Sequence, residues 1–407
     1  MNYKDAYEKL EKYGQLHVLK YYDELPEEKK EALLSQIGEL DFGILKYCKE
    51  NTTNQKGKIS PLAAMQLPEI EKNKEKYTRI GVEEIQKGKV AAVLLAGGMG
   101  TRLGSEHPKG MFDIGLTRPV YIFQRIIENM LDVVKQTDTW VRLFVMTSDK
   151  NHDMTVDFFE EKGYFGYNRD FVKFFIQDVV PASDYDGKAY MEEKWKIATS
   201  PNGNGGWFSS MNKCGLLDII KDDGIEWLNV FAVDNVLQRI ADPCFVGATI
   251  AHECVAGAKV VKKNNPDERV GALCLEDGRP SIVEYYELTD EMKKAKDSEG
   301  NPAYDFGVIL NYIFRTQKLL EIMDRQLPLH VVEKQIPYMD EEGKYVEPDT
   351  PNGYKYETLV LDMIHQVDNC LAYEVDRDRE FAPIKNATGI DSVETARKLC
   401  RKNGIEL

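Results

Sequence analysis

The sequence has little that would suit an exported or membrane-bound protein. Its seven cysteines are an odd number, lie scattered over 407 residues and include no CxxC pair. This pattern is typical of reduced thiols in a reducing compartment. No uncharged apolar run approaches the roughly 20 residues that a bilayer-spanning helix needs. The opening stretch MNYKDAYEKLEKYG is too charged for a secretory signal. We therefore expect a cytoplasmic protein without a membrane partner.

Net positive charge is also missing. The chain carries 53 Lys and Arg against 68 Asp and Glu, a formal net charge of -15. Proteins that bind nucleic-acid backbones normally present a basic face, so we expect no nucleic-acid partner. A local group of cations can still bind one small phosphate ligand. Apolar residues make up 43% of the chain, which predicts a folded core.

Two common phosphate-binding motifs are absent. A P-loop needs GxxxxGK[ST], but the span from Gly98 to Gly104 has the wrong length and is followed by Ser105. A dinucleotide fingerprint needs GxGxxG. Gly98 and Gly100 fit it, but Leu103 occupies the third glycine position. The sequence is therefore not that of a standard P-loop or dinucleotide-binding protein.

Histidine and zinc chemistry find no support either. A zinc-peptidase HExxH motif fails because His252–Glu253 is followed by Ala256 where the second histidine belongs. The six histidines show no spacing typical of metal ligands. We therefore expect neither a zinc site nor a catalytic histidine.

Residues 1–88 are rich in Lys, Glu and Leu, with apolar residues at helical spacing. Leu33, Leu34, Ile37 and Leu40 form one such stripe. The pattern predicts a helical arm of three or four helices. The arm is interpreted as a packed cap, with an oligomer contact or a lid as the alternatives.

From residue 89 the texture changes to short apolar runs separated by helical patterns. Four runs have strand length: KVAAVLLA (89–96), WVRLFVMTS (140–148), FVKFFIQ (171–177) and WLNVFAVDN (227–235). Buried strands that alternate with helices predict an α/β domain, with a mainly parallel sheet covered on both faces. We expect this domain over 89–388, followed by a short helical tail over 389–407.

The polar features of this domain follow its predicted strands. A glycine-rich loop follows the first run, Gln177 ends the third, and Asp234 ends the fourth. Ligands in such folds bind at the carboxyl ends of the strands. These three features are therefore predicted to lie along one edge of the sheet.

The glycine-rich loop reads LLAGGMGTRLGSEHPKG (94–110). Glycines let backbone N–H groups approach phosphate oxygens closely. Arg102 adds a planar fork of donors and Lys109 a point charge, two complementary ways to hold a polyphosphate. The loop therefore predicts a triphosphate site, in which both cations oppose the charge of a departing pyrophosphate. The alternative is a tight turn with solvated cations.

Two further polar segments have a chemical interpretation. Asp234 ends an apolar strand, where an unpaired carboxylate is costly unless a cation meets it. It could bind Mg²⁺, which takes one or two carboxylates and completes its shell with phosphates and water. The alternative is an Asp that caps the turn with Asn235. The loop PNGNGG (201–206) has three glycines in four residues, which suggests that a planar group packs on it, although a plain loop is also possible.

In these segments the chain resembles the UDP-N-acetylhexosamine pyrophosphorylases, a family that belongs to the UTP-dependent sugar-1-phosphate uridylyltransferases. The segment LLAGGMGTRLGSEHPKGMFDIGL is similar to the signature of this family. The resemblance continues in the family's order through these segments: GQLHVLKYYDEL (14–25), DFFEEKGYFG (157–166), FFIQDVVPA (174–182), SPNGNGGWF (200–208), AVDN (232–235), ADPCFVG (241–247), VEYYEL (283–288), PNGYKYETLVLDM (351–363) and FAPIKNA (381–387). It implies a Rossmann-like fold of the nucleotide-diphospho-sugar transferase type, with UTP, a sugar-1-phosphate, a UDP-sugar and pyrophosphate as ligands.

The resemblance also implies a role for each matched residue. Catalysis and triphosphate binding would fall to Arg102, Lys109 and Lys355, and Mg²⁺ binding to Asp234. Nucleotide contacts would come from Leu95, Ala96, Gly97, Gly98, Gly100, Thr101, Gln177 and Gly203, with Gln177 and Gly203 at the uracil. The sugar and its phosphate would be held by Asn204, Gly271, Glu284, Tyr285 and Lys385.

Four residues in three segments depart from the family pattern. Asn202 replaces the usual Asp of the PDGNGG loop, and Ile176 replaces a polar residue beside Gln177. In AYDFGVILNYIF (303–314), Phe306 and Val308 stand where the family has Ala and a sugar-holding Asn. These last two changes bear on the sugar, not on the nucleotide chemistry.

The expected activity is a Mg²⁺-dependent uridylyl transfer that makes UDP-N-acetylglucosamine. UDP-glucose or UDP-galactose synthesis with relaxed sugar specificity is the alternative within this class. A non-catalytic sensor of UTP or UDP-sugars is the alternative of another class, but it would not need all five charged residues at 102, 109, 234, 355 and 385. An NTP hydrolase is a third possibility, and the missing P-loop argues against it.

Overall fold

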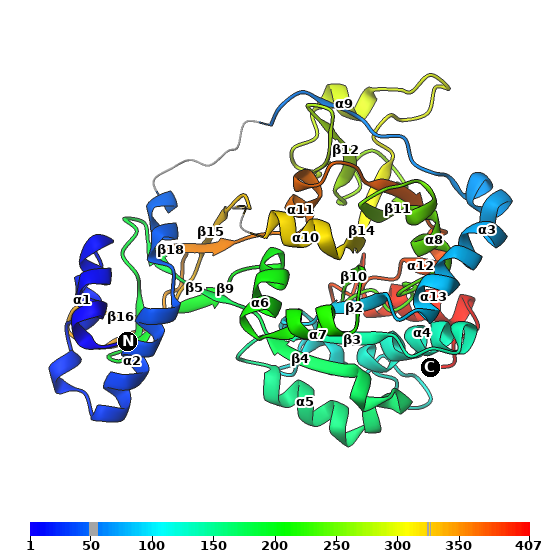
Figure 1. The fold of residues 1–407 in the computed structure, drawn as a ribbon. Helices are drawn as coiled ribbons and strands as arrows, with labels where there is room; N and C mark the ends of the chain where they lie inside the picture. Colours follow the sequence, from blue (N-terminus) through cyan, green and yellow to red (C-terminus); the bar gives the residue numbers. More distant parts are fainter. Residues whose placement is uncertain (49–55, 324, 326) are drawn as a thin grey trace. The chain divides into compact units, whose positions relative to one another are not determined.

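The structure is a computed structural model that describes residues 1–48, 56–323, 325 and 327–407. Figure 1 shows helices and strands that alternate along most of the chain. None of the helices in the described ranges is long and apolar enough to cross a membrane. All seven cysteines are free thiols, and Cys244, Cys274, Cys370 and Cys400 are buried, as expected for reduced structural cysteines.

The strands have the following bounds: β1 (Ile59–Pro61), β2 (Val90–Leu95), β3 (Arg142–Thr147), β4 (Val172–Ile176), β5 (Val179–Pro181), β6 (Ser183–Asp184), β7 (Met191–Glu193), β8 (Lys196–Ile197), β9 (Thr199–Pro201), β10 (Trp227–Ala232), β11 (Ala256–Lys262), β12 (Ala272–Glu276), β13 (Arg279–Val283), β14 (Phe306–Arg315), β15 (His330–Lys334), β16 (Tyr338–Met339), β17 (Tyr345–Val346), β18 (Gly353–Glu357) and β19 (Leu371–Glu374).

The α-helices have the following bounds: α1 (Tyr3–Lys12), α2 (Glu27–Glu39), α3 (Leu67–Gln86), α4 (Ile122–Thr137), α5 (His152–Glu161), α6 (Trp207–Lys213), α7 (Leu216–Asp222), α8 (Pro243–Ala251), α9 (Asp290–Lys294), α10 (Thr316–Ile322), α11 (Val360–Gln366), α12 (Arg377–Glu380) and α13 (Val393–Lys402).

The centre of the fold is a ten-stranded sheet. Seven of its strands follow the order β1-β12-β14-β10-β2-β3-β4, while β13 pairs with β12, β11 pairs with β14, and β19 pairs with β11. The four central strands β10, β2, β3 and β4 run parallel. They are the four apolar runs that the sequence predicts as strands. Antiparallel β14 pairs with both β10 and β11, which makes the sheet mixed. The predicted Rossmann-like α/β fold is confirmed.

Both faces of the central strands are covered. On one face, alternate residues such as Ala92 of β2 and Val145 of β3 share a hydrophobic cluster with Phe123 of α4 and Phe159 of α5. The residues between them are buried too, which requires a cover on the opposite face. There α6 contacts β4, and its Trp207 ring lies 6.4 Å from the ring of Phe314 on β14.

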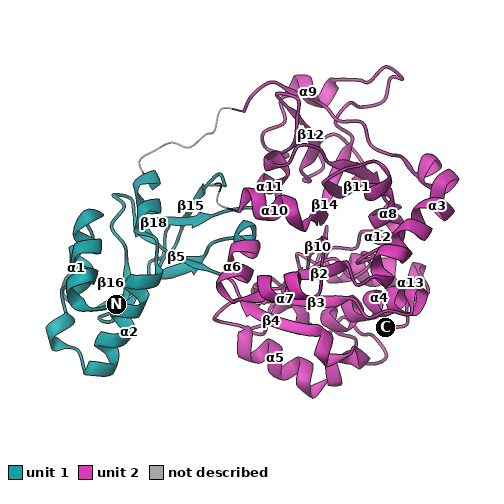
Figure 2. Ribbon diagram, viewed as in Figure 1, with its two compact units in different colours: residues 1–55, 178–206, 326–360 teal, residues 56–177, 207–325, 361–407 magenta. Residues whose placement is uncertain are grey.

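The chain divides into two compact units (Figure 2). Unit 1 consists of residues 1–55, 178–206 and 326–360, and unit 2 of residues 56–177, 207–325 and 361–407. The predicted boundaries at 88 and 388 do not coincide with these divisions. Helix α3 and the tail helix α13 fall in unit 2, because both contribute buried residues to the main cluster of the sheet.

Unit 1 contains the first two helices of the predicted helical arm. The predicted stripe Leu33, Leu34, Ile37 and Leu40 is buried. It shares a cluster with Tyr356 of β18 and residues of β5, β7 and β8. A three-stranded sheet, β15-β18-β6, belongs to the same unit. The apolar face of α2 thus packs into the core of unit 1, in agreement with the interpretation of the arm as a packed element.

Helices α3 and α8 touch through their backbones. A Cβ on Gly81 of α3 would lie 1.9 Å from the carbonyl oxygen of Pro243, and a Cβ on Gly247 of α8 would lie 1.8 Å from the carbonyl oxygen of Tyr77. Both distances are far below van der Waals contact. The helices can approach this closely only because both positions are glycine.

We predict that Gly247→Ala lowers the free energy of unfolding by about 1–3 kcal/mol, because an added methyl in a close-packed contact forces the backbones apart. Gly38→Ala in α2 is the matched control. Its Cβ would meet nothing nearer than 3.6 Å, and alanine gains up to ~1 kcal/mol of helix propensity over glycine. Urea midpoints of the two variants measure the difference. Equal midpoints would contradict the assigned contact.

Candidate active site

The predicted polar features meet at the carboxyl edge of the parallel strands. The strand order β10-β2-β3-β4 places the loop after β10 beside the glycine-rich loop after β2. The ladder continues into these loops: the Ala96 N–H donates to the Met146 carbonyl at 2.8 Å, and the Gln177 N–H donates to the Thr147 carbonyl at 2.9 Å. The predicted common edge is confirmed.

The glycine-rich loop is folded back on itself. The N–H of Lys109 donates to the Gly98 carbonyl at 3.1 Å, and the N–H of Gly100 donates to the His107 carbonyl at 2.8 Å. Gly104 has a φ of +74°, a left-handed conformation that favours glycine. The loop therefore returns Lys109 to the strand end from which it started.

The other predicted nucleotide-binding positions of this loop differ in exposure. Leu95, Ala96 and Gly100 are buried, whereas Gly98 and Thr101 are exposed. Gly98 and Thr101 are therefore accessible from solvent. The buried positions shape the loop from behind.

Gly97 and Gln177 lie against each other. A Cβ on Gly97 would lie 2.5 Å from Nε2 of Gln177, and Gln177 is only 8% exposed. The glycine leaves room for the amide of Gln177 at the strand edge. This contact places the predicted base-reading amide next to the predicted nucleotide loop.

Lys109 is the centre of a charged group. Its Nζ lies 4.0 Å from Oδ2 of Asp234, and the two side chains are 18% and 21% exposed. Burial lowers the pKa of Lys109. Asp234 opposes this shift, and the positive charges of Lys385 and Arg102 add to it. The structure therefore brings together Arg102, Lys109, Asp234 and Lys385, the charged residues that were predicted for the phosphates and the metal within unit 2.

Lys385 is held from two sides. Its Nζ lies 3.3 Å from Oδ2 of Asp391, and its N–H donates to the Asp391 carbonyl at 2.7 Å. The preceding Ile384 N–H donates to the Asp234 carbonyl at 2.9 Å. The backbone next to Lys385 is thus bonded directly to the residue that faces Lys109.

Two of the predicted sugar residues, Gly271 and Glu284, lie together at the open end of a hairpin. Strands β12 and β13 are joined by Asp277–Gly278, which both have positive φ, as the tightest hairpin turn requires. The pairing of Ala272 with Val283 places Gly271 next to Glu284. A Cβ on Gly271 would lie 3.6 Å from Oε1 of Glu284.

Val308 belongs to the same group. Its N–H donates to the Gly271 carbonyl at 2.9 Å, and its Cγ2 would lie 3.6 Å from a Cβ on Gly271. Phe306 and Val308 are half-buried and alternate with buried residues along β14, so they point to one face of the strand. Tyr285 is 38% exposed. Of the two departures, Val308 is therefore placed at the predicted sugar residues.

Gly203, Asn204 and Lys355 lie in unit 1. Gly203 has a φ of +74°, and its Cβ would lie 2.2 Å from the Thr358 carbonyl oxygen. Oδ1 of Asn204 accepts from the Val360 N–H at 2.9 Å. Lys355 lies on β18 opposite Val332. The glycine at 203 thus has a local structural reason, and the ligand roles of these three residues stay predictions.

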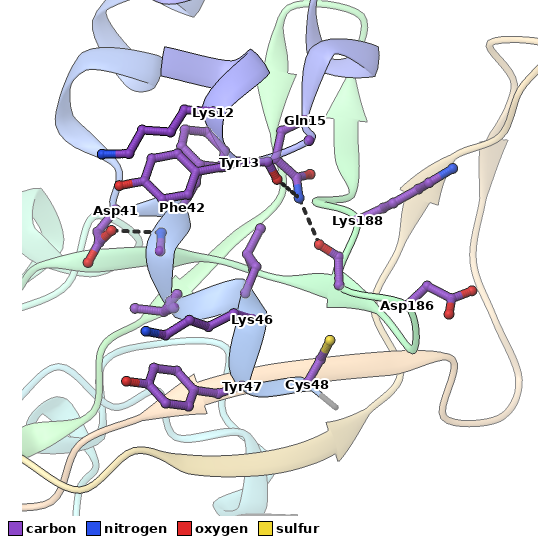
Figure 3. Close-up of a pocket in the computed structure, with 15 residues that line it drawn as sticks. Lys12, Tyr13, Gln15, Asp41, Phe42, Lys46, Tyr47, Cys48, Asp186 and Lys188 are labelled. Carbon is purple, nitrogen blue, oxygen red and sulfur yellow. Dashed lines mark hydrogen bonds between the residues drawn. The ribbon is translucent and has the colours of Figure 1, made fainter. Parts of the chain in front are cut away.

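A separate cavity of about 690 Å³ lies in unit 1 (Figure 3). It is lined by residues of α1, the segment 41–48 and the turn 186–188. Gln15 at its inner side donates to the Gly187 carbonyl and accepts from the Ala189 N–H. None of the predicted site residues lines this cavity, so its position does not support a role in the predicted chemistry.

One supporting residue of the loop was missed by the sequence analysis. Asn151 is fully buried, and its Nδ2 donates to the carbonyls of Ala96 at 2.9 Å and Gly98 at 3.4 Å. It follows β3, so its position at a strand end was a usable signal. The buried Lys259 on β11 gave no such signal, because a lysine in a strand is usually solvated.

The fold and the site together define a nucleotidyltransferase. A mixed sheet with four parallel central strands carries a glycine-rich loop, three cations and a carboxylate at the carboxyl edge of those strands. The chain belongs to the UTP–glucose-1-phosphate uridylyltransferase family, whose sequence model matches residues 43–400. It is therefore a uridylyltransferase of that family.

Relatives match over nearly the whole chain. UDP-N-acetylhexosamine pyrophosphorylase-like protein 1 from mouse is 36% identical, over 94% of this chain and 80% of its own length. UDP-N-acetylglucosamine pyrophosphorylase from Saccharomyces cerevisiae is 34% identical, over 96% and 88%. The crystal structure of uridine diphosphate N-acetylglucosamine pyrophosphorylase from Trypanosoma brucei has a TM-score of 0.84 at 28% identity, over 98% and 84%.

The lowered pKa of Lys109 predicts a pH dependence. Because burial and neighbouring cations disfavour the charged form, Lys109 loses its proton at a lower pH than an ordinary lysine. If the charge is needed, kcat/KM for UTP, which reports the free enzyme, should fall as pH rises through this lowered pKa. Lys109→Arg stays charged, so its alkaline loss should move to higher pH. Lys89→Arg is the control, and identical profiles for the two variants would refute the assignment.

Proposed function

We propose that the protein is a Mg²⁺-dependent UDP-N-acetylglucosamine pyrophosphorylase. It would form UDP-N-acetylglucosamine and pyrophosphate from UTP and N-acetylglucosamine-1-phosphate. The observation that carries the proposal is the group of Arg102, Lys109, Asp234 and Lys385 at the ligand edge of the sheet. The names of the relatives from Saccharomyces cerevisiae and Trypanosoma brucei support the choice of sugar.

The substrates of this reaction bring their own nucleophile. A phosphate oxygen of the sugar-1-phosphate attacks the α-phosphorus of UTP, and the bond to the pyrophosphate oxygen breaks. The protein then has to align two anions and stabilise the charge on the leaving pyrophosphate. Lys385, with Lys355 as the predicted partner at the α-phosphate, would oppose the repulsion between the substrates. Arg102 and Lys109 would stabilise the leaving group.

The residues at Asp234 fit a magnesium ion that is held mainly by substrate. Mg²⁺ is usually bound through one or two carboxylates, together with phosphates and water. Asp234 supplies one partly exposed carboxylate beside the glycine-rich loop. Within the described ranges no group of three His, Cys, Asp or Glu side chains is placed to hold a metal. Asp234 would therefore hold the ion, which when bound neutralises phosphate charge.

A side activity on unsubstituted hexose phosphates is favoured by Val308. This side chain lies beside Gly271 and Glu284, where the family has an asparagine. A valine offers no hydrogen bond to an acetamido group and makes its surroundings less polar. UDP-glucose synthesis is therefore the second candidate function.

The test of the proposal is pyrophosphate release from UTP across a panel of sugar-1-phosphates. Release should require both UTP and the sugar phosphate, and ATP should be a poor substitute, because a site that hydrogen-bonds one base leaves its polar groups unpaired with another. Arg102→Ala and Lys109→Ala should each lower kcat at least about 10²-fold. Asp234→Ala should abolish the Mg²⁺-dependent turnover.

Folding of the loop variants should be unaffected, since Arg102 is exposed and the charge of Lys109 is disfavoured by burial. Thermal unfolding of each variant is the control. Release without sugar phosphate would indicate a hydrolase, and binding without turnover would indicate a sensor. Either result would refute the proposed transfer.

The sugar preference is tested at Val308. We expect Val308→Asn to reduce the ratio of kcat/KM for glucose-1-phosphate over N-acetylglucosamine-1-phosphate by up to about tenfold, because one hydrogen bond contributes roughly 0.5–1.5 kcal/mol. Val308→Ala is the matched control, since it adds space without a polar group. A wild-type protein that uses glucose-1-phosphate and leaves the N-acetylated sugar untouched would overturn the first choice of substrate.

A further inference from the structure

Unit 2 contains a fully buried lysine outside the predicted site. The side chain of Lys259 on β11 has no exposed surface. Its Nζ lies 2.6 Å from Oε2 of Glu380 and 3.1 Å from Oδ2 of Asp242, and donates to the Arg239 carbonyl at 3.2 Å. Three oxygen partners thus surround one ammonium group.

A buried cluster of charges such as this one contributes little to the free energy of unfolding. Removing ions from water costs several kcal/mol per ion, and apolar side chains of similar volume often stabilise a fold equally well. Burial alone would raise the pKa of Asp242, but Lys259 and Arg239 hold it below its usual value. Burial raises the pKa of Glu380, against the opposing charge of Lys259. The cluster therefore calls for an explanation other than net stability.

Glu380 connects the charge cluster to the predicted site, because the segment that begins at Glu380 is hydrogen-bonded to Asp234 and Asn235. The carbonyl of Glu380 accepts from Nδ2 of Asn235 at 2.7 Å. The N–H of Ala382 donates to Oδ1 of Asn235 at 2.9 Å, and the N–H of Ile384 donates to the Asp234 carbonyl at 2.9 Å. Residues 380–384 therefore pair with 234–236, and Lys385 follows directly.

The other partner of Lys259 fixes the opposite side of the same loop. Asp242 caps α8 by accepting from the Cys244 N–H, and α8 begins where the loop after Asp234 ends. Within this loop, Gln238 is fully buried, and its Nε2 donates to the carbonyls of Ala232 and Asn235. Through Asp242 and Glu380, Lys259 thus connects the end of the loop that follows Asp234 to the start of the segment 380–385.

We propose that Lys259, through Glu380, is a positioning residue that sets the distance between Asp234 and Lys385. The ammonium holds the Glu380 carboxylate. The hydrogen bonds of residues 380–384 with the Asn235 side chain and the Asp234 carbonyl then fix the position of Lys385. The sugar phosphate that Lys385 holds is thereby presented at the metal-binding carboxylate. This inference rests on the proposed function.

The test removes the contact between Lys259 and Glu380 and keeps the ion pair of Lys259 with Asp242. In Glu380→Ala, Lys259 keeps Asp242 as its partner, so the protein should fold. Glu380→Gln keeps the side-chain length and an oxygen that accepts a hydrogen bond from Nζ. We expect Glu380→Ala to raise KM for the sugar-1-phosphate roughly tenfold, because the charged contact from Lys385 would be misplaced. KM for UTP should stay within about twofold of the wild-type value. Glu380→Gln should restore most of the affinity.

The matched control is Arg142→Met. It breaks an ion pair of 2.6 Å with Asp223, far from the carboxyl edge because Arg142 begins β3. We expect it to lower thermal stability without a change in either KM. If Glu380→Ala leaves KM for the sugar phosphate unchanged, or shifts both KM values equally as a general loss of stability would, the positioning role is refuted.

A second readout does not depend on activity. Hydrogen exchange of the Ala382 and Ile384 amides should be faster in Glu380→Ala than in wild type, while the amides of α4 stay protected. Unchanged exchange at both amides would refute the inference. A wild-type protein without turnover would refute the proposed function, and the exchange experiment would still decide whether Glu380 holds this segment in place.

Discussion

The site depends on one electrostatic constraint, the charge of Lys109 held away from water beside a single carboxylate. Burial lowers the pKa of Lys109, and the positive charges of Lys385 and Arg102 lower it further, whereas Asp234 opposes this shift. Only a rigid framework can hold such a group. The framework is the parallel pairing of β10 with β2, which fixes the loop of Asp234 next to the loop of Lys109. A triphosphate would relieve the repulsion, and this favours binding of a polyanion.

The packing around the loop serves the same constraint. Gly110 follows Lys109, and a Cβ there would lie 2.3 Å from the ring of Phe123 on α4. The loop is therefore anchored to a core helix immediately after its lysine. On the other side, Asn151 binds the carbonyls of Ala96 and Gly98. Both ends of the loop are thus tied to the core around the sheet, whereas Arg102 between them is exposed.

The sequence alone predicts the parts of this site that follow from local patterns. The apolar runs identify the four parallel strands, and the rule for parallel sheets places Gln177, Asp234 and the glycine-rich loop along one edge. The pairing of the segment before Lys385 with Asp234 could not be predicted, because Ile384 and Asp234 lie 150 residues apart and share no local signal. For Gly203 the pattern suggested a ligand, and the structure shows a close approach to Thr358. The units escaped prediction because their segments are discontinuous.

The discontinuity of unit 1 has a consequence for the protein during synthesis. Its apolar cluster joins Leu33 and Leu34 to Val180 and Tyr356, so the cluster is incomplete until the chain has grown past β18. At roughly 5–20 residues per second, the ribosome needs on the order of 15–60 s to add the intervening stretch. Over that time the apolar stripe of α2 lacks its final partners. The interval gives chaperones and other nascent chains an opportunity to bind it, a kinetic cost set by chain order, whatever the stability of the finished fold.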